Sequence, residues 1–144
     1  MLWLALVQLF ALTAFATLLL VLSLWALSIP LRDISIIDMA FSALITAVLF
    51  IAYMFTGAQG IIATTILVLV VVWACRMSVY LVHRNWGHGE DPRYTRLRKW
   101  VEPGWPFHWL SLRQVFLLQG AVIWVLTLPQ QIAMVTGATA NFGA

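Results

Sequence analysis

Long apolar stretches separated by short polar segments dominate the sequence. Each stretch reaches the roughly 17–25 residues that an α-helix needs to cross the ~30 Å hydrocarbon core of a bilayer. We expect membrane-spanning helices over about residues 2–28, 34–56, 61–83 and 112–128. The pattern therefore predicts an all-α integral membrane bundle with four transmembrane helices in a single transmembrane domain.

Prolines and glycines mark the expected helix ends. Proline lacks an N–H donor and disfavours helical geometry in the preceding residue, so we expect the first span to end at Ile29-Pro30 and the fourth at Pro129. After Pro129 the sequence becomes a small, polar tail with no closing element, which we expect to face outward. The uncharged turn Gly-Ala-Gln-Gly at 57–60 predicts an antiparallel hairpin of the second and third spans.

Composition and charge set the class and the orientation. The chain is 63% hydrophobic and 9% charged, which excludes a soluble globular domain. Six of the eight Lys and Arg lie between Arg84 and Arg113. This bias indicates a cytoplasmic loop over 84–111 and an outward N-terminus, with no nucleic-acid partner. Cys75 is the only cysteine, which excludes an internal disulfide and a cysteine-based metal cluster.

Two charged residues, Asp38 and Arg76, fall a turn or more inside the predicted spans. Arg76 would lie about two turns below the polar end of its helix and Asp38 about one turn below the same end, so their depths differ by about 5 Å. An isolated arginine in hydrocarbon costs at least ~2.5 kcal/mol, so we expect Asp38 and Arg76 to make contact, directly or through water. The pair would either lock two helices together or form the floor of a polar cavity open to the cytoplasm.

Arg76, Tyr80 and Arg84 are spaced by four residues, with Trp73 one turn deeper. Such a helix face could bind a phosphate or carboxylate and stack a planar ring. Alternatively, Arg84 reaches the lipid phosphates and Tyr80 belongs to the interfacial aromatic belt.

The following loop carries Glu90, Asp91, Arg93 and Tyr94 after two glycines. We expect it to fold back over a cavity mouth, with Glu90 or Asp91 paired to Arg84 or Arg93. His88 and Glu90 alone make a weak metal signal, so we expect no metal. Gln119 is a lone polar group that we expect to hydrogen-bond another helix.

Four ordered blocks resemble the steroid 5-alpha-reductase-like membrane proteins, and more narrowly their bacterial branch. They are Arg-Asp-x-Ser-x-x-Asp at 32–38, Trp-x-x-Arg-x-Ser-x-Tyr-Leu-x-x-Arg at 73–84, Gly-Glu-Asp-Pro-Arg-Tyr at 89–94 and Val-Phe-Leu-Leu-Gln-Gly at 115–120. Two features differ from the family: Phe41-Ser42 replaces a Trp-Gly pair, and Trp73 stands near the place of a proton-donating tyrosine.

The resemblance implies a membrane oxidoreductase that uses NADPH to reduce a carbon–carbon double bond conjugated to a carbonyl in a lipid-like or steroid-like substrate. It implies catalytic roles for Asp38, which would orient the substrate, and for Tyr80. It implies that the cofactor site includes Arg76, Tyr80, Arg84, Glu90, Asp91, Arg93 and Tyr94.

The resemblance also implies that the chain is the N-terminal part of a seven-helix fold. The family's C-terminal block, Ser-Arg-His-Pro-Asn-Tyr, has no counterpart after Gln130, so we expect a further C-terminal half or another subunit to complete the site. Two alternatives stay open. One is an S-adenosylmethionine-dependent methyltransferase on a related scaffold, and the other is a non-catalytic four-helix scaffold or partner subunit.

Overall fold

The computed structural model describes residues 2–57, 60–85 and 91–141, with side chains through Gly137. Its elements are α1 (Leu2–Leu31), α2 (Ile36–Thr56), α3 (Ile61–Asn85), α4 (Pro92–Lys99), α5 (Trp105–Ser111), the π-helix η1 (Leu112–Leu117) and α6 (Leu118–Asn141). No strand occurs in these ranges. Four segments are long and apolar enough to cross a membrane: α1, α2, α3 and the continuous helix through 105–137. The predicted all-α class with four membrane spans is confirmed.

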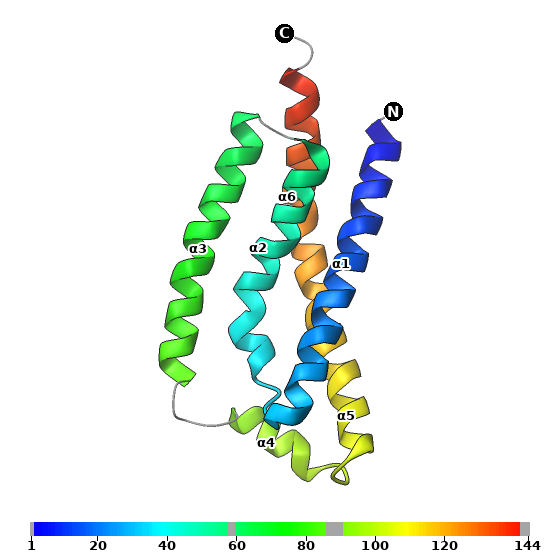
Figure 1. Cartoon of the computed structure of the whole chain (residues 1–144), viewed down its shortest axis with the longest axis vertical. Helices are drawn as coiled ribbons and strands as arrows, with labels where there is room; N and C mark the ends of the chain where they lie inside the picture. Colours follow the sequence, from blue (N-terminus) through cyan, green and yellow to red (C-terminus); the bar gives the residue numbers. More distant parts are fainter. Residues whose placement is uncertain (1, 58–59, 86–90, 142–144) are drawn as a thin grey trace.

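α2 lies at the centre of the bundle and packs against α1, α3 and α6 (Figure 1). α1 also packs against α6. The largest buried side chains come mainly from α1, α2 and α6, and from α5 and η1. α3 lies at the outer edge, where Ala63 and Ala74 are its buried residues. A hydrogen bond between the Ser42 and Ser78 hydroxyls, 2.9 Å apart, connects α3 to α2.

Two glycines of α6 allow neighbouring helices to approach closely. A Cβ at Gly120 would lie 3.0 Å from Cγ2 of Val21 on α1, and one at Gly137 would lie 3.3 Å from Cβ of Ile62 on α3. Small residues at such crossings bring helix backbones together in membrane bundles.

The two prolines do not end their helices, so those predicted boundaries were wrong. α1 continues through Pro30 and ends at Leu31; the next residue, Arg32, has the left-handed backbone (φ 54°) that terminates many helices. The Asp33 N–H donates to Ser28 O (3.3 Å) and the Arg32 N–H to Ile29 O (3.2 Å), which completes that motif.

α6 likewise continues through Pro129 to Asn141, so the segment after Pro129 is helical rather than an irregular tail. Proline removes a single backbone donor, and the rest of an apolar segment still needs helical hydrogen bonds to satisfy its backbone. Prolines are therefore tolerated in membrane helices.

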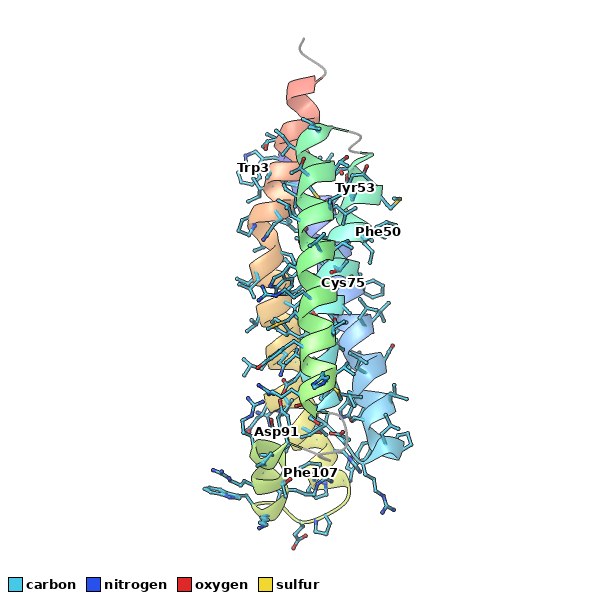
Figure 2. All side chains as sticks on the ribbon, turned by 90° about the vertical axis from the view of Figure 1, so that its left-hand side faces the viewer. Trp3, Phe50, Tyr53, Cys75, Asp91 and Phe107 are labelled. Carbon is cyan, nitrogen blue, oxygen red and sulfur yellow. The ribbon has the colours of Figure 1, made fainter. Side chains whose placement is uncertain are left out.

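The expected loop at 84–111 contains two short helices at one end of the bundle, which we call the polar end (residues 32–38 and 91–113). α4 and α5 lie there, opposite the start of α1 and the end of α6 (Figure 1). The indole N–H of Trp25 on α1 donates to the carbonyl oxygen of His108 on α5 at 3.1 Å. In Figure 2, Asp91 and Phe107 are at the polar end, and Trp3 is at the other.

Candidate functional site at the polar end

Asp38, in the first turn of α2, is the centre of a hydrogen-bonded cluster. Its Oδ1 accepts from the Tyr94 hydroxyl (3.0 Å) and from Nε2 of Gln119 (2.7 Å). Its Oδ2 accepts from the same hydroxyl (3.0 Å) and from the Arg93 guanidinium (3.0 Å). α2, α4 and α6 thus each contribute side chains to what we call the Asp38 cluster: Asp38, Asp91, Arg93, Tyr94 and Gln119.

The start of α4 places two of these donors. Asp91 is the N-cap, its side chain accepts from the Arg93 backbone N–H at 2.9 Å, and Pro92 occupies the first helical position. The Arg93 guanidinium also donates to both Asp91 oxygens at 3.0 Å, so Arg93 bridges two carboxylates. The predicted pairing of Asp91 with Arg93 is confirmed.

Charge and burial shift the pKa values of the α4 residues. The hydrogen bonds from Arg93 hold the pKa of Asp91 below its ordinary value, and the hydrogen bond to Asp91 raises the pKa of Arg93. Burial, and then the Asp38 charge, raise the pKa of Tyr94 well above its ordinary value. Tyr94 is therefore a neutral phenol at physiological pH, and it donates a hydrogen bond without giving up its proton.

Gln119 contributes a donor and an unused acceptor. Its Nε2 faces the Asp38 carboxylate, which can only accept, so the orientation of the amide is fixed. Its Oε1 is buried and accepts no hydrogen bond from the described residues. Buried polar atoms are nearly always paired, so this oxygen is a candidate acceptor for a donor group of a bound molecule. The predicted contact of Gln119 with another helix is confirmed.

The predicted direct contact of Asp38 with Arg76 is wrong. Arg76 lies on the exposed face of α3, and Asp38 pairs with Arg93 instead. The residues that the spacing along α3 assigns to one helix face do lie together. Trp73, Arg76, Met77 and Tyr80 line a hollow of about 240 Å³ on this helix. Tyr80 is 58% exposed there.

The remaining predicted site residues lie apart from the cluster or outside the described ranges. Arg84, in the last turn of α3, donates to the side-chain oxygen of Asn85 at 3.5 Å. Glu90 lies outside the described residues, as does His88. Within residues 2–57, 60–85 and 91–141, no group of three or more His, Cys, Asp or Glu side chains could hold a metal ion.

Sequence reasoning missed a second polar cluster, deep in the bundle between α1 and α6. Gln131 is fully buried, and its amide oxygen accepts from the Thr13 hydroxyl at 2.9 Å. The Gln131 amide donates to Thr127 (2.9 Å), and the Trp124 indole N–H donates to Thr13 (3.2 Å). The sequence feature that could have revealed this cluster is the three- and four-residue spacing of Trp124, Thr127 and Gln131. This spacing places the three residues on one face of a helix that continues past Pro129.

Comparison with known proteins connects the Asp38 cluster to a family. A family model described as "Protein of unknown function (DUF1295)" matches residues 24–144, a range that includes the whole cluster. No curated protein matches the chain. No solved structure matches it.

Proposed function

The chain belongs to the DUF1295 family, and we propose that it is a membrane-embedded NAD(P)H-dependent reductase of a conjugated carbon–carbon double bond in a lipid-like substrate. This family is related to the steroid 5-alpha-reductase-like proteins. The proposal rests on the Asp38 cluster, in which three hydrogen-bond donors converge on one point at the end of a membrane bundle. A cytoplasmic polar end in a bacterial plasma membrane would give the site access to reduced nicotinamide.

The donors of the cluster suit the charge that this reaction develops. When a hydride adds to the β-carbon of an enone, electrons move onto the carbonyl oxygen, and a proton then adds to the α-carbon. Preorganised donors aimed at that oxygen stabilise the developing charge. Tyr94 and Gln119 both donate to Asp38 in this structure, and we propose that the Tyr94 hydroxyl and the second N–H of the Gln119 amide would supply such donors when substrate binds.

Tyr94 is well suited to polarise a carbonyl. Its hydroxyl donates to Asp38 and lies 3.0 Å from each carboxylate oxygen; rotation of the hydroxyl hydrogen would turn the donor from Asp38 to a substrate carbonyl without moving the ring. Because Tyr94 is a neutral phenol, it remains a donor throughout the physiological pH range. We assign Asp38 as the residue that orients Tyr94 and Gln119, and Arg93 as the residue that positions Asp38.

The hollow on α3 fits part of a nicotinamide cofactor. The Arg76 guanidinium makes no hydrogen bond or ion pair with the described residues, and Arg76 lines the same hollow as Trp73 and Tyr80. A cation next to aromatic faces can hold a phosphate and stack a planar ring. At about 240 Å³ the hollow is smaller than the ~300–1,000 Å³ of a small-molecule site, so further protein would complete it. When bound, the cofactor would supply the hydride.

Ligand-dependent unfolding and turnover test the proposal. We expect NADPH to raise the unfolding temperature of the detergent-purified protein and S-adenosylmethionine to leave it unchanged. With a lipid-like enone added, we expect NADPH consumption that falls roughly 10²-fold in Asp38→Asn, because the donors of the cluster lose their orientation. Asp33→Asn, at the same end but bonded to Ser35, is the matched control and should retain activity.

Three outcomes would contradict the reductase. Stabilisation by S-adenosylmethionine alone would favour methyl transfer. No response to either cofactor would favour a scaffold or partner subunit. Full activity of Asp38→Asn would show that the Asp38 cluster takes no part in the reaction.

A further inference from the structure

α4 is attached to the bundle differently from the other helices (Figure 1). Among the described elements, the closely packed helix pairs involve α1, α2, α3, α5, η1 and α6, and α4 belongs to none of them. Tyr94 is the buried residue of α4, and most of its other side chains are polar or basic and exposed. Few buried apolar contacts are typical of a segment that opens locally while the rest of a protein stays folded.

Two sets of side-chain contacts hold α4, one at each end of the helix. At its start, Arg93 and Tyr94 both donate to the Asp38 carboxylate of α2 at 3.0 Å. At its other end, the Arg98 guanidinium lies 4.2 Å from the centre of the Phe107 ring and donates at 3.3 Å to a backbone carbonyl oxygen in the turn after α1. We call the first set, the hydrogen bonds of Arg93 and Tyr94 to Asp38, the latch.

With the latch formed, the donors of the Asp38 cluster are out of reach of a ligand. Tyr94 is 9% exposed, and its hydroxyl lies 3.5 Å from Nε2 of Gln119. The side-chain oxygen of Gln119 is buried and accepts no hydrogen bond from the described residues. An unpaired buried acceptor destabilises the arrangement that buries it, so this closed position of α4 carries a cost that opening would relieve.

We propose that α4 is a lid over the Asp38 cluster, hinged at its Arg98 end and held shut by the latch. Release of Arg93 and Tyr94 from Asp38 would give the substrate carbonyl access to Tyr94 and Gln119. Arg93 is 65% exposed, and exposed ion pairs are weak, so the latch can open and close readily. The inference rests on the proposed function only because it takes the Asp38 cluster as the ligand site.

Hydrogen exchange of the α4 backbone tests the lid in the detergent-purified chain. Because an eight-residue helix is not stable alone in water, its amide hydrogens exchange when α4 detaches. We expect Arg93→Gln to raise the exchange rate of α4 about fivefold, the effect of losing an exposed ion pair. Arg96→Gln removes the same charge from the exposed face of α4 and is the matched control, with an expected change of less than about twofold.

Asp38→Asn removes the charge from the other side of the latch and should accelerate exchange of α4 by a similar factor. If Arg93 and Asp38 act on each other, the double variant should exchange at most about twice as fast as Arg93→Gln alone. Independent effects would instead multiply to about 25-fold, and that result would overturn the proposal. Equal exchange rates in Arg93→Gln and Arg96→Gln would also overturn it.

Access to the cluster can be measured directly with Gln119→Cys in a Cys75→Ala background. We expect a small neutral methanethiosulfonate reagent to label this variant slowly, and about fivefold faster once Arg93→Gln is added. Adding Arg96→Gln instead should leave the labelling rate unchanged. A rate that does not depend on Arg93 would mean that α4 does not cover the cluster. Neither measurement uses a nicotinamide cofactor or an enone, so the lid and the reductase can fail independently.

Discussion

Asp91 acts on α4 in two ways, as its N-cap and as the partner of Arg93. Arg93 holds the pKa of Asp91 below its ordinary value of 3.8 in the folded protein, so the ionised form stabilises the fold. This contribution is complete above the unfolded pKa and is lost as the pH falls through the folded pKa. Between about pH 5 and pH 2, we therefore expect wild type to lose more stability than Asp91→Asn, measured by thermal unfolding.

Asparagine still caps a helix, so the difference between the two proteins isolates the charge. Glu102→Gln, at an exposed carboxylate of the same end, should keep the wild-type pH profile. Identical profiles for wild type and Asp91→Asn would refute the stabilising role of the Asp91 charge.

Of the charged pairs in the site, one could be predicted from the sequence and one could not. The Asp91–Arg93 pair was predictable because the two residues lie within one helix turn. The Asp38–Arg76 pair was not, because helical spacing gives the face of each helix and its depth but not its rotation toward a neighbour. Arg76 turns outward on α3, and Asp38 meets Arg93 because the Asp91 cap starts a helix inside the expected loop.

At the element scale, the crossing of α1 and α6 depends on Gly120. A methyl group there would lie 3.0 Å from Val21, which is buried and, as a β-branched residue in a helix, has one preferred rotamer. We expect Gly120→Ala to destabilise the bundle by about 1–3 kcal/mol, measured by reversible unfolding in detergent.

The double variant Val21→Ala with Gly120→Ala should recover part of this loss, because the smaller side chain makes room. Gly137→Ala is the matched control: its methyl group would lie 3.3 Å from Cβ of the 49% exposed Ile62, so α3, at the outer edge of the bundle, would need only a smaller shift. Equal effects of the two glycine substitutions would show that helix propensity, not the α1–α6 contact, decides the outcome.

The helices themselves were largely predictable, but their ends and rotation were not. Proline signals were misleading at both Pro30 and Pro129, because a continuous backbone hydrogen-bond ladder matters more in an apolar surrounding than one missing donor. The π-helix η1 gave no recognisable sequence signal. It directly precedes α6 and so contributes to the rotation that turns Gln119 toward Asp38.

At the scale of the whole molecule, the orientation in the membrane can be tested with single cysteines. In a Cys75→Ala background, we would introduce Trp3→Cys near the start of α1 and Trp100→Cys at the end of α4, at opposite ends of the bundle (Figure 1); the native side chains are 80% and 85% exposed. We expect a membrane-impermeant maleimide to label Trp3→Cys in right-side-out vesicles and Trp100→Cys in inverted ones. Labelling of both from one side would contradict a bundle whose two ends face opposite compartments.

The uncharged turn between α2 and α3 has an electrical consequence. Between Asp38 and Arg76 the chain carries no ionisable Lys, Arg, Asp or Glu, so moving this turn across the bilayer during insertion transfers no side-chain charge. The transmembrane voltage therefore neither helps nor hinders this step. Inverting the molecule would instead carry a net charge of +3 across the bilayer. When the compartment on the arginine side is 100 mV negative, this inversion costs about 7 kcal/mol. In an energised membrane the voltage itself thus favours one orientation of the finished bundle.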